Sequence, residues 1–153
     1  MFKCLFAKST LAFAVDEPNI VITKDFTKCK NDLALHGTEY NTVSDGYITF
    51  PAKLFHTDIQ FICGIHYNLN TIQYIEIFRP IEYSQSTAFD IHQSYKQLSD
   101  VLKKQFGNPI HTTGESIGGQ QNEQWICKGF IINHYLLDRF GLEEHLHINF
   151  FKE

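Results

Sequence analysis

A single helical pattern, set between two groups of strand-like patterns, most constrains how this chain can fold. Apolar residues recur there at helical spacing and form one stripe, which consists of Ile91, Tyr95, Leu98, Val101, Leu102 and Phe106. Asp90 is a suitable N-cap with Gln93 as its capping-box partner, and Gly107 ends the pattern. The sequence therefore predicts one main amphipathic helix over about residues 90–106.

Strand patterns lie on both sides of this helix. Before it, the stretch TDIQFICGIHYNLNTIQYIEIFRP predicts a hairpin, with Asn68-Leu69-Asn70 as its connection. After it, QWICKG, FIINHYLLD and EHLHINFF are three further strand candidates, and Arg139-Phe140-Gly141 turns the second into the third. The first third of the chain, with short apolar runs such as NIVIT and DLALHG, is expected to be irregular. The order predicts an α+β protein with a mainly antiparallel sheet packed against one main helix.

Length and charge narrow the classes of function. The 153 residues suit a single domain, 1–153, that buries a substantial core. The formal net charge of −4 disfavours direct binding of nucleic acid, which needs clustered Lys and Arg, whereas a basic protein remains a suitable partner. No stretch approaches the roughly 20 apolar residues that span a bilayer. The apolar run near the N-terminus is broken by Lys8-Ser9-Thr10, so we expect no signal peptide and a cytoplasmic protein without membrane contact.

The four cysteines are spread along the chain, at Cys4, Cys29, Cys63 and Cys127. None lies close enough to another to form a CxxC or zinc-knuckle motif. Cys63 and Cys127 lie in apolar, strand-like runs. Buried thiols in a reducing compartment are the simplest interpretation, although an even number also permits two disulfides.

The stretch EEHLHINF contains the most suggestive pair of side chains. In a strand, alternate residues face opposite ways, so His145 and His147 share one face with Glu143 and the apolar residues share the other. Such a pair can bind a metal, but a catalytic metal usually needs a third protein ligand. His134, Glu143 and Asp138 are candidates, and no spacing selects one of them. A polar, solvent-facing strand face is the preferred interpretation.

Other catalytic arrangements are less well supported. The stretch GESIG has the Gly-x-Ser-x-Gly spacing, but no helical pattern follows it as a nucleophile elbow requires, and no cysteine lies beside an obvious base in a motif. The stretch GESIGGQQ contains Gly114, Gly118 and Gly119 but lacks the Gly-Lys-Ser/Thr of a phosphate-binding loop. We therefore expect no catalytic residue and no cofactor, and interpret this loop as a surface segment that could take part in recognition.

The stretch DRFGLEE places charged residues around a tight turn. A solvated hairpin end with an internal ion pair is its simplest interpretation. The functional alternative is an acidic docking edge, in which Asp138, Glu143 and Glu144 meet basic residues of a partner while Phe140 provides an apolar anchor.

The stretches QYIEIFRPIEYSQSTAFDIHQSYKQLSDVLKKQFGNP and WICKGFIINHYLLDRFGLEEHLHI resemble the immunity proteins encoded beside bacterial polymorphic toxins, including those of contact-dependent growth inhibition systems. The resemblance covers roughly the C-terminal half and lies in layout rather than in a diagnostic motif. It implies a cytoplasmic protein that binds the C-terminal domain of its cognate toxin, often a nuclease with a basic cleft, and covers the active site or substrate-binding surface. The partner-binding residues would then be Asp138, Phe140, Glu143 and Glu144.

The alternative function belongs to a different class. His145 and His147 could serve a small histidine-dependent or metal-dependent enzyme, or a ligand-binding protein, because unperturbed imidazoles titrate near neutral pH. The sequence leaves both functions open and prefers the inhibitor, which is not an enzyme.

Overall fold

The computed structural model describes residues 12–113, 121–138 and 140–151. An eight-stranded, fully antiparallel sheet forms its centre, in the order β3-β4-β5-β6-β10-β9-β8-β7. Its strands are β3 Asn41–Ser44, β4 Tyr47–Lys53, β5 Gln60–Asn68, β6 Thr71–Phe78, β7 His111–Thr113, β8 Asn122–Ile126, β9 Phe130–Asp138 and β10 Leu142–Phe150. The predicted α+β fold with a mainly antiparallel sheet is confirmed.

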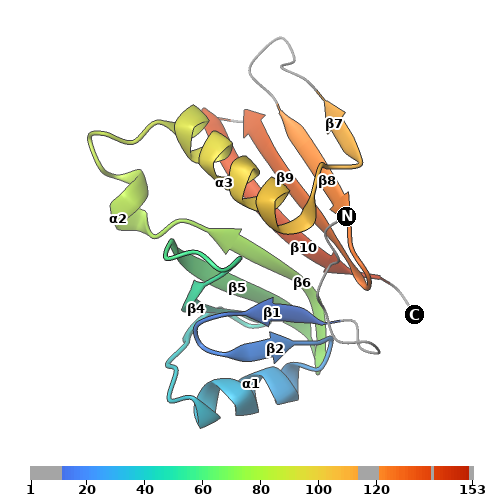
Figure 1. Cartoon of the computed structure of the whole chain (residues 1–153). Coiled ribbons are helices and arrows are strands. Elements are labelled where there is room, and N and C mark those ends of the chain that lie inside the picture. The colour runs from blue at the N-terminus through green and yellow to red at the C-terminus, as the bar shows by residue number, and fades with distance from the viewer. Residues whose placement is uncertain (1–11, 114–120, 139, 152–153) are drawn as a thin grey trace.

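The sheet consists of two meanders that meet in its middle. The first meander starts with β3 at one edge of the sheet and ends with β6 in the middle. The second starts with β7 at the other edge and ends with β10, which pairs with both β6 and β9. The connection between the meanders contains the short helix α2, Ile81–Ser84, and the long helix α3, Ile91–Phe106 (Figure 1). This topology brings residues 71–78 beside residues 142–150, which are far apart in the sequence.

Helix α3 forms where the apolar stripe predicts it. The Asp90 side chain accepts hydrogen bonds from the backbone N–H groups of His92 and Gln93, and Gly107, at φ 83°, follows the last helical residue. Lys103 and Lys104 lie in the last turn, where positive charge suits the helix dipole. The stripe buries Leu98 and Leu102 against the sheet, so the predicted packing of one main amphipathic helix on the sheet is confirmed.

The first third of the chain is more regular than expected. A small hairpin, β1 Phe13–Val15 with β2 Ile20–Ile22, precedes the helix α1, Phe26–Leu35. Asp25 caps α1 by accepting from the backbone N–H of Lys28. The helix buries only Phe26, Cys29 and Leu33, and this narrow stripe is too sparse to stand out in the sequence. The expectation of irregular structure in this segment was therefore wrong.

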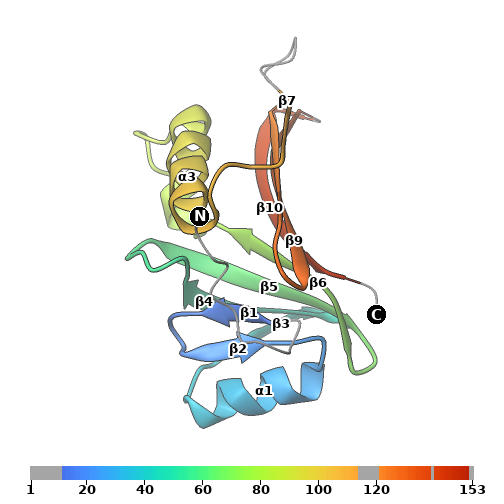
Figure 2. The ribbon, with the colours of Figure 1, turned by 45° about the vertical axis from the view of Figure 1, so that its right-hand side comes forward.

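One face of the sheet is covered and holds the core. The hairpin β1–β2, α1 and α3 all contribute to the same cluster of buried apolar residues. Its sheet residues alternate along the strands, for example Cys63 and Ile65 on β5 and Leu146 and Ile148 on β10. In Figure 2, α3 stands on one side of β9 and β10, and among the described residues no helix or strand covers their other side. We call this uncovered side the open face.

Pro51 lies inside β4 without breaking the sheet. It pairs with Ile62 of β5 on one side, while β3 on the other side reaches only as far as Thr49. A proline cannot donate to a ladder, so it is tolerated where the neighbouring strand has ended. Within the part of the chain that the structure describes, no helix is long and apolar enough to cross a membrane.

Candidate functional site

The open face carries a continuous row of tyrosine and histidine rings across five neighbouring strands. We call this set the aromatic row; it consists of Tyr47 on β4, His66 on β5, Tyr74 on β6, His147 and His145 on β10, and Tyr135 on β9. All six side chains are partly exposed. The residues of the row are far apart in the sequence, and they lie side by side because β10 is placed between β6 and β9 in the sheet.

Strand register places these rings in contact. Tyr47 pairs with His66, and His66 pairs with Tyr74. The ring centroids of the first pair lie 4.0 Å apart and those of the second 4.2 Å apart, both nearly parallel. On the other side of the sheet centre, Tyr135 pairs with His145 and stacks on it at 5.0 Å. Cross-strand aromatic pairs of this kind stabilise a sheet and hold the rings in fixed orientations.

A glycine makes room for the first ring of the row. A Cβ atom at Gly64 would lie 2.8 Å from the Tyr47 ring, closer than real Cβ contacts allow. The Tyr47 ring therefore lies flat against the backbone of β5. From there its hydroxyl donates a hydrogen bond of 3.3 Å to Glu76 Oε2. Partial burial, followed by the nearby Glu76 carboxylate, raises the pKa of Tyr47 to about 12, so this hydroxyl keeps its proton.

Glu76 of β6 lies at the centre of the aromatic row. Its Oε2 contacts His66 Nε2 at 3.3 Å, and its Oε1 lies 3.7 Å from His147 Nε2, the residue opposite it on β10. The His147 imidazole has the largest effect on Glu76 and lowers its pKa. Burial raises the pKa and the His66 imidazole lowers it again, so that the pKa of Glu76 is about 2. Glu76 is therefore ionised over the whole physiological range.

One ring nitrogen of His147 is buried and lacks a hydrogen-bond partner. Its Nε2 is shielded from solvent, has no hydrogen-bond partner and is too far from Glu76 Oε1 for a hydrogen bond. One ring nitrogen of His145, one of His147 and one carboxylate oxygen of Glu76 all lie within 4.8 Å of one another. The two histidines thus share a face as the alternation predicts, and the structure adds Glu76, which the sequence did not single out.

His134, the histidine considered as a third ligand, lies on the opposite side of the sheet. It is fully buried beneath α3, and its two ring nitrogens contact Glu123 at 3.4 Å and Glu144 at 2.8 Å. Tyr95 of α3 stacks on the ring at 4.0 Å. His134 pairs with Leu146 in the sheet, so it faces the core and cannot meet His145 or His147.

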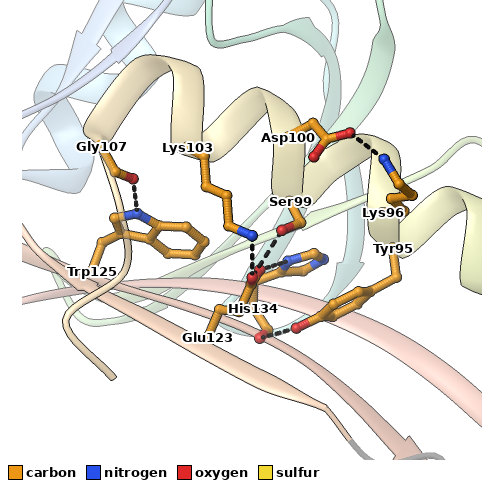
Figure 3. Close-up of polar contacts among 9 residues, drawn as sticks. All are labelled: Tyr95, Lys96, Ser99, Asp100, Lys103, Gly107, Glu123, Trp125 and His134. Atoms are coloured by element: carbon orange, nitrogen blue, oxygen red, sulfur yellow. Dashed lines mark hydrogen bonds and ion pairs between the residues drawn. The ribbon is translucent and has the colours of Figure 1, made fainter. Parts of the chain in front are cut away.

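The buried network around His134 joins α3 to the sheet (Figure 3). Ser99 donates 2.8 Å to Glu123, and Lys103 Nζ lies 3.2 Å from the same carboxylate. Ser94 donates 2.5 Å to Glu144. The polar stretch of α3 is therefore a structural joint in which two hydroxyls and the Lys103 ammonium face two carboxylates that flank His134.

The ionisation of Glu123 makes stability depend on pH. Burial raises the pKa of this carboxyl, but hydrogen bonds from His134, Ser99 and Lys103 outweigh burial and leave it below its ordinary value of 4.5. Because the folded pKa is the lower one, the stabilisation is complete above pH 4.5 and is lost as pH falls through the folded value. We expect the free energy of unfolding to fall more steeply with acidification in the parent chain than in Glu123→Gln. Urea unfolding from pH 7 to pH 3 measures this; equal slopes would contradict it.

The hairpin end between β9 and β10 separates the four residues of the expected docking edge. Phe140 is fully exposed, and Asp138 and Glu143 are also exposed. Glu144 is not part of this edge, because its carboxylate points under α3 and contacts His134 and Ser94. Its expected exposure was wrong: the alternation of β10 places Glu144 with Leu146 on the core side.

Glu143 connects the hairpin end to the open face. Its Oε2 lies 3.2 Å from His145 Nε2, next to the Tyr135 ring. A cavity of about 270 Å³ opens on the other side of the hairpin, between β6, β10 and the start of α3. Its lining is largely apolar, with Arg79 at one wall. The recognition loop expected around Gly114, Gly118 and Gly119 lies outside the described residues, as does Cys4.

The cysteines that the structure describes are buried, and Cys29 and Cys63 lie in the core cluster. Burial, reinforced by Asp32, raises the pKa of the Cys29 thiol to about 12, and burial raises the pKa of Cys63 well above its ordinary value. Thiols of such high pKa are poor nucleophiles, since the thiolate is the reactive form. These two cysteines are therefore packing residues.

In comparisons with known proteins, no family model, no curated protein and no solved structure matches the chain.

Proposed function

We propose that this chain is a protein-binding protein that uses the open face of its sheet, and that it acts as an immunity protein for a toxin domain. The observation that carries the proposal is the aromatic row, a set of six partly exposed rings that no other element of the described chain covers. Tyrosine is among the residues that most often dominate the binding energy of protein interfaces.

The geometry of the row suits binding. Stacking fixes the Tyr47, His66 and Tyr74 rings before a partner arrives, so little side-chain entropy is lost on association. The hydroxyl and imidazole groups can hydrogen-bond to a partner, while the ring faces supply apolar area. A rigid and amphipathic surface of this kind fits a protein partner better than a small molecule, which prefers a concave site.

Charge favours a basic partner surface. The chain carries a formal net charge of −4, the exposed Glu143 extends the open face to the hairpin end, and Asp138 is exposed at the same end. Phe140 projects from the same end as an exposed apolar group. Such a surface complements the basic substrate cleft of a nuclease toxin. The bound chain would cover this cleft and would not be cleaved as a substrate. The partner-binding set is then Tyr74, Tyr135, Asp138, Phe140 and Glu143, without Glu144.

Replacing Tyr74 and Tyr135 by alanine tests the proposed surface. Cells that produce this chain together with the C-terminal domain of a toxin encoded beside it should grow, and the double variant should fail to protect them. Each tyrosine is expected to contribute about 2 kcal/mol, so each single variant should bind the purified toxin domain about 30-fold more weakly. Calorimetry of the purified pair measures this loss.

A matched control lies away from the open face. Tyr83→Ala removes a partly exposed tyrosine from α2, which is not part of the aromatic row, and should leave the affinity unchanged. Equal affinity of the Tyr74→Ala, Tyr135→Ala variant and the parent chain would contradict the surface. Failure of the parent chain to protect or bind would contradict the immunity function itself.

A second candidate function, in an enzyme or ligand-binding protein that uses His145 and His147, gains support from one observation. Glu76 supplies the carboxylate that converges with both rings. Glu76, His145 and His147 do not line the 270 Å³ cavity beyond the hairpin, and their convergence supports ion binding better than the binding of an organic substrate.

A further inference from the structure

We propose that Glu76, His145 and His147 form a binding site for one divalent transition-metal ion of the zinc class. The site is independent of any protein partner. Two imidazoles and one carboxylate are the donors that zinc commonly takes from proteins, and cobalt and nickel accept the same set.

The separations of the donor atoms fit such an ion. Metal–ligand bonds of about 2.0–2.1 Å in a tetrahedral site place the donor atoms about 3.3 Å apart. His147 Nε2 and Glu76 Oε1 are 3.7 Å apart, and all three donors lie within 4.8 Å of one another. Small side-chain rotations would close the remaining distance, and the backbones already sit opposite each other because His147 pairs with Glu76.

The unsatisfied nitrogen of His147 is independent evidence for a ligand. A buried polar atom without a partner costs free energy, and native proteins rarely keep one without a reason. His147 Nε2 is such an atom, and it lies on the side of the ring that faces Glu76 Oε1. A cation between these two atoms would satisfy both.

Neighbouring residues already hold the ligands in place. Tyr47 and His66 both hydrogen-bond to Glu76 Oε2, which leaves Oε1 directed at His147. Glu143 contacts the His145 ring. Outer contacts that orient ligating side chains are typical of protein metal sites. The fourth position would be taken by water from the outer side of the rings, where His145 and His147 are partly exposed.

Titration of the chelator-treated chain with zinc chloride tests the site. The parent chain should bind one equivalent, and cobalt chloride should give the visible absorption of a tetrahedral ion. Glu76→Gln and His147→Ala should each weaken zinc binding by at least about tenfold. Tyr47→Phe, a positioning variant, should weaken zinc binding while the melting temperature of the metal-free protein stays close to that of the parent.

The controls separate a built site from a chance chelate. His111→Ala removes an exposed histidine from β7, on the far edge of the sheet, and should leave zinc affinity unchanged. Circular dichroism verifies that each variant is folded, and the near-isosteric Glu76→Gln keeps the test available if His147→Ala unfolds. Unchanged affinity in Glu76→Gln, or no stoichiometric binding by the parent chain, would overturn the proposal. Neither result bears on toxin binding, which is measured in metal-free buffer.

Discussion

Replacing His134 by alanine is expected to lower the free energy of unfolding by about 3–5 kcal/mol, because the remaining members of the buried polar network would stay buried without their partner. His134 is fully buried, and its ring lies between the carboxylates of Glu123 and Glu144. Without it, both carboxylates remain beneath α3 with Lys103 as the nearby cation that pairs with Glu123. Chemical denaturation followed by circular dichroism measures the loss.

A triple variant separates the effect of unpaired buried charge from the effect of lost side-chain volume. Buried ion networks that are replaced as a whole by apolar residues of similar size often cost little. Glu123→Leu, His134→Phe and Glu144→Leu together should therefore be less destabilised than His134→Ala alone. The exposed His111→Ala variant serves as the reference for a harmless histidine replacement. A triple variant that is at least as unstable as the single one would contradict the electrostatic explanation.

Local patterns predicted the elements whose signals are contained within a few residues. Helix α3 has a wide apolar stripe, an N-cap and a terminal glycine, and it occurs as expected. The predicted hairpin is present as β5 and β6, with Leu69 in the left-handed region at the connection. These features depend on neighbours along the chain, so one sequence suffices to find them.

The elements that were missed depend on tertiary contacts. Helix α1 buries three residues in ten, and its Phe26 ring stacks on Tyr67 of the distant strand β5. The strands β1 and β2 have only three residues each and are buried by contact with the rest of the core. Their apolar residues form no period long enough to identify a strand or a helix from the sequence alone.

The candidate site also combines residues that local patterns find with a residue that only the tertiary structure adds. Alternation in β10 placed His145 and His147 on one face, and the same alternation, applied to Glu144 and His134, would have placed both on the core side. Glu76 could not be found in this way, because it joins the histidines only through the pairing of β6 with β10. Local periodicity does not reveal the order of strands in a sheet. The convergence of the three residues could therefore be found only from the structure.

Replacing Trp125 by alanine is the second change expected to cost about 3–5 kcal/mol, through lost apolar burial and the cavity that remains. Trp125 of β8 is 2% exposed and lies in the core cluster between the sheet and α3. Its Nε1–H also donates 2.8 Å to the carbonyl oxygen of Gly107, the residue that ends α3 (Figure 3). The side chain thus fills the core and fixes the C-terminus of the helix.

Trp125→Phe separates these two roles. Phenylalanine keeps most of the apolar volume and loses the hydrogen bond, so its cost should be nearer to about 1 kcal/mol. Trp125 is the only tryptophan of the chain, so unfolding of the variants must be followed by circular dichroism instead of tryptophan fluorescence. If Trp125→Phe were as unstable as Trp125→Ala, the bond to Gly107 and not the filled volume would dominate. Because α3 covers the face opposite the aromatic row, Trp125→Phe should also leave zinc binding at Glu76 unchanged.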